Sequence, residues 1–378
     1  MSSTIQRPCY VTREELKRSL DVKQSLYNDQ QIDRQIIAGS DSIDQLCKRV
    51  FFPTDATYKF DWPNYQYTYP WKLYFRDHGG GDLAAQPTLV VTGTYLTVPI
   101  VIPIASCIFQ PVNSGPPFTW MELRRDLSAF FGGNTTPQND IGVTGSWGYW
   151  LNTQPGGLLT SGIDGVTTTL QMSAGAGVYV GVGDTIIIDN ERMLVTDIGY
   201  NSTGITFNGL VSTPPSASDN VLTVADGTQF SAQETISLDS EIVRVINIIG
   251  NNLILKRAWD GTVLATHTSG TIYANRQATV VRGALGTTAA AHLANAPIKV
   301  LAIPGLVKQT ALAEAVIGLT QEPNAYAFDL ETRTRVAQNV YGGTGHAQQR
   351  EPAIGVGITD LRDRCAARYG VQVRSRVI

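Results

Sequence analysis

Residues 184–195 read DTIIIDNERMLV, and residues 234–245 repeat the pattern 50 positions later as ETISLDSEIVRV. Each copy has an apolar run, an acidic turn and a second apolar run, which is typical of a β-hairpin. A unit of this length matches a small β-meander, and two copies are too few for a solenoid. The sequence therefore predicts two related small β modules.

A second repeated pattern, R-x3-G-T-x4-H, occurs with identical spacing at residues 257–267 and 282–292. Its glycines favour tight turns, and its Arg, Thr and His side chains suit hydrogen bonds to loop amides and carbonyls. The repeated His267 and His292, with the repeated carboxylates, also invite a metal or general-base interpretation.

Two observations favour the structural interpretation. The histidines form no HxH, HxxxH or HExxH motif, and each one belongs to its own copy of the repeat. Duplication alone therefore explains why they recur. The carboxylate pair Asp239 and Glu241 is expected to face solvent or to pair with Arg244 or Lys256.

Short strands are expected from about Phe51 to Leu301, between turns rich in Gly, Pro, Asn and Ser. The aromatic run from Tyr58 to Phe75 has a period close to two, which belongs to strands. The stretch Leu89–Phe109 is long and apolar enough to cross a bilayer. Its prolines and threonines argue against a helix there, so we expect strands and no membrane span.

Helices are expected at both ends of the chain. TREE at residues 12–15 forms a capping box, and apolar residues recur on one face from Asp29 to Val50. Further helices are expected from Pro304 to Leu319 and from Thr359 to Tyr369. The predicted class is α+β, with N- and C-terminal helices forming one helical connector domain around a large all-β insertion.

The expected division of the chain has five parts. They are 1–52 and 303–370 as the two halves of the helical domain, 53–160 as a β-sandwich-like insertion, 161–302 as the repeated β modules, and 371–378 as a strand-like tail.

Composition narrows the function classes. The chain has 378 residues with 29 Lys+Arg and 32 Asp+Glu, and this near-neutral balance gives no prior for nucleic-acid or membrane-surface binding. Only 16% of residues are charged, which favours a subunit packed into a larger assembly. The four cysteines form no CxxC pair and no signal peptide opens the chain, so we expect reduced thiols and assembly in a cytoplasm.

No motif indicates catalysis. The sequence contains no GxSxG, P-loop or dinucleotide fingerprint, and the glycines beside His78 and His346 lack a strand–turn–helix context. We therefore expect no enzyme activity, no cofactor and no metal.

The last residues carry the only charge bias, with five arginines between Arg362 and Arg376. The end of the chain alternates apolar and polar residues, which predicts a strand able to add to the sheet of another protein. A protein partner is favoured over nucleic acid because no aromatic residues are interleaved. The residues assigned to this contact are Val371, Gln372, Val373, Arg374, Ser375, Arg376, Val377 and Ile378.

The chain resembles the head-to-tail connector (adaptor) proteins of long-tailed bacteriophages, in the siphovirus-type forms of actinobacterial phages. The similar segments are YVTREELKRSL (10–20), RVFFP (49–53), TWMELRRDLSAFF (119–131), VTGSWGY (143–149) and GVGITDLRDRCAARYG (355–370). The repeated β segments resemble modules widespread in phage structural proteins. The long β insertion departs from the minimal helical connector, so nothing from minimal members transfers to it.

This resemblance implies a virion protein of the neck, assembled in the host cytoplasm. It implies a homo-oligomeric ring, normally a dodecamer, docked under the portal protein with double-stranded DNA passing non-specifically through its lumen. The C-terminal tail would engage the portal, and the far face would receive neck, stopper or tail-terminator proteins.

Two other classes stay open at this stage. A tail-tip or receptor-binding protein would use its β modules, and the aromatic run from Tyr58 to Phe75, to contact host glycans. A β-rich hydrolase would need a nucleophile–base pair, which the sequence does not display.

Overall fold

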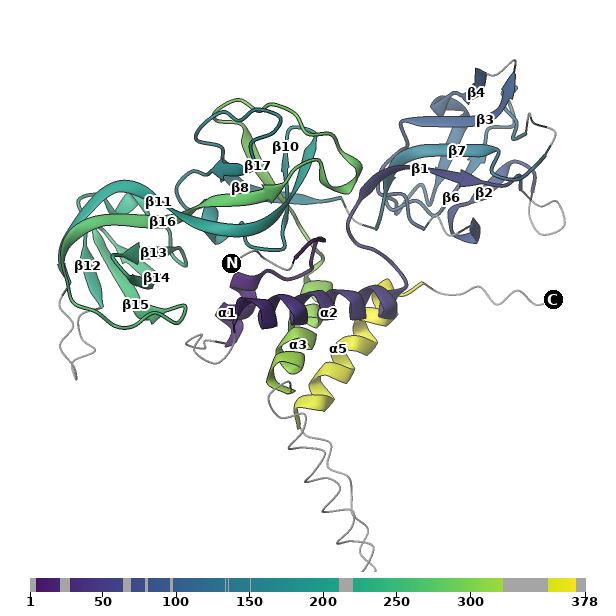
Figure 1. The fold of residues 1–378 in the computed structure, drawn as a ribbon. Helices are drawn as coiled ribbons and strands as arrows, with labels where there is room; N and C mark the ends of the chain where they lie inside the picture. The colour runs from purple at the N-terminus through teal and green to yellow at the C-terminus, as the bar shows by residue number, and fades with distance from the viewer. Residues whose placement is uncertain are drawn as a thin grey trace, which may run out of the picture.

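The computed structural model describes residues 5–20, 28–63, 69–78, 81–95, 98–132, 134, 136–149, 151–210, 220–321 and 353–371 (Figure 1). Strands dominate this part of the chain, which contains seventeen strands and four α-helices. The helices are α1 (Arg13–Leu20), α2 (Asp29–Cys47), α3 (Gly305–Gln321) and α5 (Ala353–Tyr369).

Two antiparallel sheets form a sandwich. The first has the order β1 (Thr54–Phe60), β7 (Ile141–Trp147), β3 (Leu89–Tyr95) and β4 (Val98–Ile102). The second has the order β2 (Lys72–Tyr74), β6 (Trp120–Leu123) and β5 (Cys107–Gln110). Both bury side chains in one core around Phe60, Phe75, Met121 and Trp147.

The third sheet has ten strands. Its order is β12 (Val221–Thr223), β15 (Asn252–Trp259), β14 (Glu241–Ile249), β13 (Thr235–Leu238), β16 (His267–Val281), β11 (Glu191–Leu210), β10 (Thr185–Ile188), β17 (Pro297–Leu301) and β8 (Thr153–Leu158), and β9 (Thr169–Gln171) also pairs with β16. It covers two separate cores, one around Ile186 and Val280 and one around Ile236 and Leu253. The long strands β11 and β16 join the two lobes (Figure 1).

The two repeated sequences form equivalent hairpins in these two lobes, β10–β11 and β13–β14. In the first, Ile188 pairs with Glu191, and in the second, Leu238 pairs with Glu241. We call the lobe with the first hairpin the first module and the other lobe the second module.

The capping box expected at the start of α1 is present. The amide of Glu15 donates to Thr12 Oγ1 at 3.1 Å, and the amide of Thr12 donates to Glu15 Oε2 at 3.3 Å. Helices α2 and α3 approach closely because α2 carries a glycine at the crossing. A Cβ at Gly39 would lie 2.9 Å from the carbonyl oxygen of Ala311.

The predicted fold class, an α+β chain with a helical connector domain formed by its two ends, is wrong. The structure is mainly β, and its few helices do not enclose a core of their own. Leu16 and Ile36 share a core with Val182 and Leu194 of the first module, and Leu301 of β17 joins a second mixed core. The apolar sides of the helices are therefore completed by a sheet, which the helical periodicity alone does not reveal.

The apolar stretch Leu89–Phe109 contains β3, β4 and the first part of β5, as its prolines and threonines predict. In the part of the chain that the structure describes, no helix is long and apolar enough to cross a membrane.

Candidate functional site

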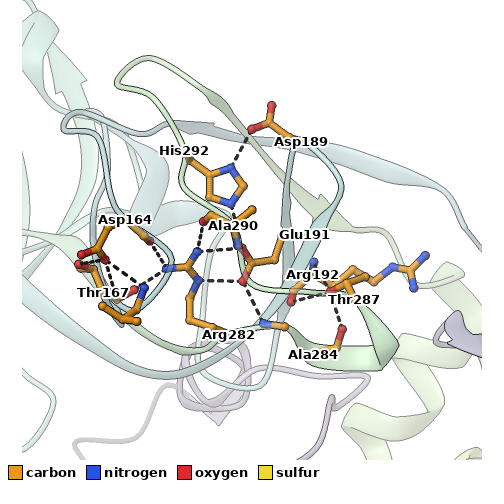
Figure 2. Close-up of polar contacts among 12 residues, drawn as sticks. Asp164, Thr167, Asp189, Glu191, Arg192, Arg282, Ala284, Thr287, Ala290 and His292 are labelled. Atoms are coloured by element: carbon orange, nitrogen blue, oxygen red, sulfur yellow. Dashed lines mark hydrogen bonds and ion pairs between the residues drawn. The ribbon is translucent and has the colours of Figure 1, made fainter.

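Buried charge gathers at the end of the first module, where the two repeated sequence patterns meet (Figure 2). Glu191, only 2% exposed, begins β11, and its carboxylate accepts five hydrogen bonds. Arg282 donates from Nε and Nη2, both at 2.8 Å. The amides of Gly283 and Ala290 donate at 2.9 Å each, and His292 Nε2 lies at 3.0 Å.

His292 is held between two carboxylates. Its Nδ1 lies 2.7 Å from Asp189 Oδ2, and its Nε2 faces Glu191. Each ring nitrogen therefore faces a carboxylate oxygen within hydrogen-bonding distance. With both nitrogens engaged in this way, neither is open to a metal ion. No group of three potential metal ligands occurs among the residues that the structure places.

These contacts set the charge of the buried carboxylate. Burial by itself would raise the pKa of Glu191, but hydrogen bonds from Arg282, the Ala290 and Gly283 amides and His292 outweigh it. They lower the pKa of Glu191 to about 2. Glu191 therefore stays ionised throughout the physiological range, as a structural anion does and as a general acid working near neutral pH does not.

Arg282 also binds the loop that contains Asp164 and Thr167. Its Nη1 donates to the carbonyl oxygens of Asp164 at 2.9 Å and Thr167 at 2.7 Å, and its Nη2 also donates to the carbonyl of Ala290. All five N–H groups of this guanidinium are thereby used. Within this loop, Asp164 Oδ1 accepts from the amides of Val166 at 3.0 Å and Thr167 at 2.7 Å.

The second module repeats the contacts of the buried carboxylate and the histidine. Glu241 accepts from Arg257 Nε at 2.9 Å and Nη2 at 2.7 Å, and from the amides of Ala258 at 2.7 Å and Ala265 at 3.1 Å. His267 Nε2 lies 3.0 Å from Glu241, and its Nδ1 lies 2.8 Å from Asp239 Oδ2. Burial again opposes the hydrogen bonds, which lower the pKa of Glu241 to about 2. We call the two sites the Glu191 cluster and the Glu241 cluster.

The repeated threonines close the same turn in both modules. Thr287 Oγ1 accepts from the Arg192 amide at 3.0 Å and donates to the Ala284 carbonyl at 2.8 Å. Thr262 Oγ1 accepts from the Ile242 amide at 3.1 Å and donates to the Trp259 carbonyl at 2.7 Å. The turn backbones match as well, since φ is 53° at Leu285 and 55° at the equivalent Asp260.

The expectation that Asp239 and Glu241 face solvent or pair with Arg244 or Lys256 holds for Asp239, whose side chain is 55% exposed, but is wrong for Glu241. Glu241 is neither solvated nor paired with Arg244 or Lys256, because it is fully buried against Arg257 and His267. The guanidinium of Arg244 and the ammonium of Lys256 lie over the Trp259 ring, at 4.9 and 5.5 Å from its centroid. The missed signal was that the acidic pair and the R-x3-G-T-x4-H pattern are duplicated together.

The turns of both clusters contact other parts of the same chain. In the first module, Arg192 forms an ion pair with Asp55 of β1 at 2.9 Å, and a Cβ at Gly286 would lie 2.0 Å from the Asp55 carbonyl oxygen. In the second module, Asp260 forms an ion pair with Lys17 of α1 at 2.8 Å. The two clusters thus attach the modules to the sandwich and to the helices.

A cavity of about 100 Å³ lies between α1 and the second module. Two of its cations are paired, because Arg13 binds Asp33 at 2.7 Å and Lys17 binds Asp29 at 2.9 Å. Arg18 and the buried Asn275 also line it. The ion pairs, including that of Lys17 with Asp260, make the cavity a joint between helices and sheet.

The assigned portal-binding residues are only partly placed. Val371 follows α5, and its amide donates to the carbonyl of Cys47 at the end of α2, at 3.1 Å. Gln372–Ile378 lie outside the described residues, as does His346.

The aromatic run divides into two groups. Tyr58, Phe60 and Phe75 pack around Trp147 in the sandwich core, with ring centroids 4.5, 5.8 and 5.2 Å from it. The second group lies on the sandwich surface, and each of its rings contacts another ring or a cation. It comprises Tyr69, Trp71 and Tyr74 of the run, and their partners are Trp120 of β6, Lys72 and Arg125. Tyr65 and Tyr67 lie outside the described part of the chain.

The chain matches no protein-family model, and no curated protein or solved structure matches it either.

Proposed function

We propose that the chain is a non-enzymatic structural subunit of a bacteriophage virion, a head-to-tail adaptor. In this proposal it forms a ring between the capsid portal and the tail, and DNA passes through the lumen. The observation that carries the proposal is that the Glu191 and Glu241 clusters fix the loops around them. They hold exposed apolar loops rigidly at the surface, as an assembly protein requires.

Among the residues that the structure describes, the three most exposed large apolar side chains lie on loops that the two clusters fix. Leu293 is 84% exposed, Val263 is 81% exposed and Val166 is 80% exposed. Leu293 directly follows His292, and Val166 lies in the loop whose carbonyls bind Arg282. Val263 follows Thr262 and precedes Ala265, both of which are hydrogen-bonded to the hairpin. Because the backbone is fixed beforehand, a partner binding there orders few additional residues.

The chemistry of these loops favours protein partners. Loop residues 261–266 and 283–296 contain no Asp, Glu, Lys or Arg, and the loop 159–168 around Val166 contains only Asp164. Such a surface has no cations for phosphate groups, and its apolar side chains suit the desolvated centre of a protein interface. These loops, together with the low overall charge, support a subunit that works inside an assembly.

The position of the tail supports the portal as one partner. Val371 is attached to the end of α2, so residues 371–378 begin at the helical side of the molecule. The contact that we propose is addition of this segment to a sheet edge or groove of the portal, through its backbone hydrogen bonds.

The test measures particle mass for the purified chain, alone and mixed with the portal of the same phage. We expect a ring alone or on the portal, and loss of portal joining when residues 371–378 are deleted. A second variant exchanges Val263 for Asp, which places a charge on a cluster loop and leaves the tail intact, and it should weaken ring assembly. Stable joining by the truncated chain would refute the role of the tail, and no joining by the intact chain would refute the adaptor.

The receptor-binding alternative is less well supported. A glycan platform needs aromatic faces open to sugar rings, but the Arg125 guanidinium lies 4.7 Å from the Trp71 centroid and Lys72 Nζ lies 4.7 Å from that of Trp120. A soluble trimer that ignores the portal and binds host cells would favour this alternative.

A further inference from the structure

Two cysteines far apart in the sequence meet at the base of the C-terminal helix. Cys47 is the last residue of α2, Cys365 lies in α5, and their Sγ atoms are 3.7 Å apart. Both residues are 0% exposed. The other two cysteines, Cys9 and Cys107, are also unpaired thiols, but they lie in different cores.

The contacts around the pair hold the two thiols against each other. Tyr369 of α5 packs edge-on against Phe51 and Tyr149, with ring centroids 5.6 Å apart in both cases. Arg362 of α5 forms a bidentate ion pair with Glu314 of α3. The amide of Val371 donates to the carbonyl of Cys47 itself. Packing on both sides of Cys365 therefore keeps α5 in register with α2.

We propose that Cys47 and Cys365 are a covalent modification site, at which a peroxide oxidises the two thiols to a disulfide that joins α2 to α5. The reaction needs only a short sulfur movement, because the thiols are already in contact. The two residues are 318 positions apart, so the bond would close almost the whole chain into one loop.

The chemistry proceeds in two balanced steps. A Cys365 thiolate attacks one oxygen of hydrogen peroxide, breaks the O–O bond and becomes a sulfenic acid, while hydroxide leaves and takes up the thiol proton as water. The Cys47 sulfur then attacks the sulfenic sulfur, and the hydroxyl leaves as a second water with the remaining thiol proton. The two thiols lose two electrons in total, and the peroxide gains them.

The pair favours this order of events. A hydrogen bond from the Cys47 thiol stabilises the Cys365 thiolate and lowers the pKa of Cys365, despite the opposing effect of burial. The same interaction, with burial, raises the pKa of Cys47. Cys365 is therefore the attacking sulfur, and Cys47 resolves the sulfenic acid.

Access requires α5 to open, because neither sulfur is exposed. The outer side of α5 is solvated, and Arg362 anchors it to Glu314 by an ion pair at the surface. Exchange of Arg362 for Ala should speed the oxidation by up to about fivefold, the effect expected of an exposed ion pair.

The site stands independently of the proposed function, but its consequence rests on that function. Oxidation would fix α5 directly before residues 371–378. The root of the proposed portal-binding tail would then be locked once a particle leaves a reducing cytoplasm.

The test treats the reduced full-length chain with hydrogen peroxide and measures intact mass and peptide linkage without reductant. We expect a loss of about 2 Da and one cross-linked peptide containing Cys47 and Cys365. Exchange of Cys9 and Cys107 together for Ser should leave the product unchanged. Exchange of Cys365 for Ser should abolish it, with circular dichroism confirming that the variant is folded.

A link in either the wild type or the Arg362→Ala chain supports the proposal. The absence of a link in both chains, a link through Cys9 or Cys107, or oxidation of the pair only to sulfinic acid would overturn it. Portal joining is then measured with oxidised and reduced chains. A disulfide that forms in a chain unable to join the portal would refute the adaptor and leave the redox site standing.

Discussion

Exchange of Glu191 for Gln separates the charge of the buried cluster from its shape. The amide side chain has one oxygen and one NH2 group, and the carboxylate oxygens receive two and three donors respectively. In either orientation, the NH2 group therefore faces at least two buried donors. One of them always belongs to Arg282, which also loses its counter-charge.

Two independent arguments give the magnitude. Breaking a buried ion pair by removing the charge of one partner costs about 3 to 5 kcal/mol. Separately, the pKa of Glu191 falls from 4.5 to about 2, and each unit corresponds to about 1.4 kcal/mol, which gives roughly 3 kcal/mol. We therefore expect a loss of about 3 to 5 kcal/mol in the first module.

The assay is hydrogen exchange at the amides of Gly283 and Ala290, which bind the carboxylate directly. Their protection should fall by roughly 100- to 5000-fold, which is the lost free energy expressed as a rate ratio. The amides of Ala258 and Ala265, in the intact Glu241 cluster, supply the internal control. Exchange of Glu241 for Gln should reverse the pattern.

A matched surface variant shows how large the loss is when the histidine contact is removed without disturbing the buried carboxylate. Asp189 binds the same histidine, but its side chain is 60% exposed, so exchange for Asn should cost less than about 1 kcal/mol. Equal small losses for the Glu191 and Asp189 variants would refute the argument that the buried carboxylate organises the loops. Because the pKa of Glu191 is lowered on folding, its stabilisation is present above about pH 4.5 and is lost as the pH falls towards 2. The wild type and the Gln variant should converge there.

Three further predictions concern the joints that connect the modules to the helices and to the sandwich. Burial and the charge of a neighbouring carboxylate raise the pKa of Asp184 to about 8. Its contribution to stability is therefore complete below pH 4 and disappears as the pH rises through 8. Exchange of Asp184 for Asn should make the melting temperature less dependent on pH across that window, and an unchanged slope would contradict this. Exchange of Asp260 for Asn removes its ion pair with Lys17 of α1. Because the two side chains are only 25% and 12% exposed, thermal shift should register a loss of about 1 to 3 kcal/mol that high salt reduces only in part, and a loss that high salt abolishes would contradict this. Exchange of Gly286 for Ala should make the joint with β1 more susceptible to proteolysis, because the new Cβ would overlap the Asp55 carbonyl. Exchange of Gly250 for Ala is the control for backbone strain alone, since Gly250 has a similar φ of 61° and open space around it. Equal cleavage of the two variants would argue against the contact.

Local patterns predicted local structure well in this chain. The period of the repeated segments indicated the hairpins, and TREE at residues 12–15 indicated the start of α1. The fold class failed because it depends on which elements complete one another. Helix α3 is apolar on most of its sides, so its sequence gives no face that would reveal whether a helix or a sheet covers it.

The two clusters show a related limit. Both repeated patterns were visible, but Glu191 is 91 positions from Arg282 and 101 from His292, and no local rule joins residues so far apart. In the second module the separations shrink to 16 and 26 positions. The Glu241 cluster, whose partners lie close in the sequence, predicts the equivalent contacts of the Glu191 cluster once the two repeats are aligned.

Strands β11 and β16 run through both modules and are hydrogen-bonded to each other along most of their length, with three shifts in register. This hydrogen-bond ladder lets the two strands transmit a mechanical force from one module to the other. At about 3.3 Å per residue, the 20 residues of β11 would span on the order of 60 Å. A force pulling the two modules apart along the strands would act on all these hydrogen bonds in shear at once. The strand pair should bend at its register shifts, which lie at Thr196, Tyr200 and Thr203–Ile205. Repeated force on a particle should therefore deform these three points before either core opens.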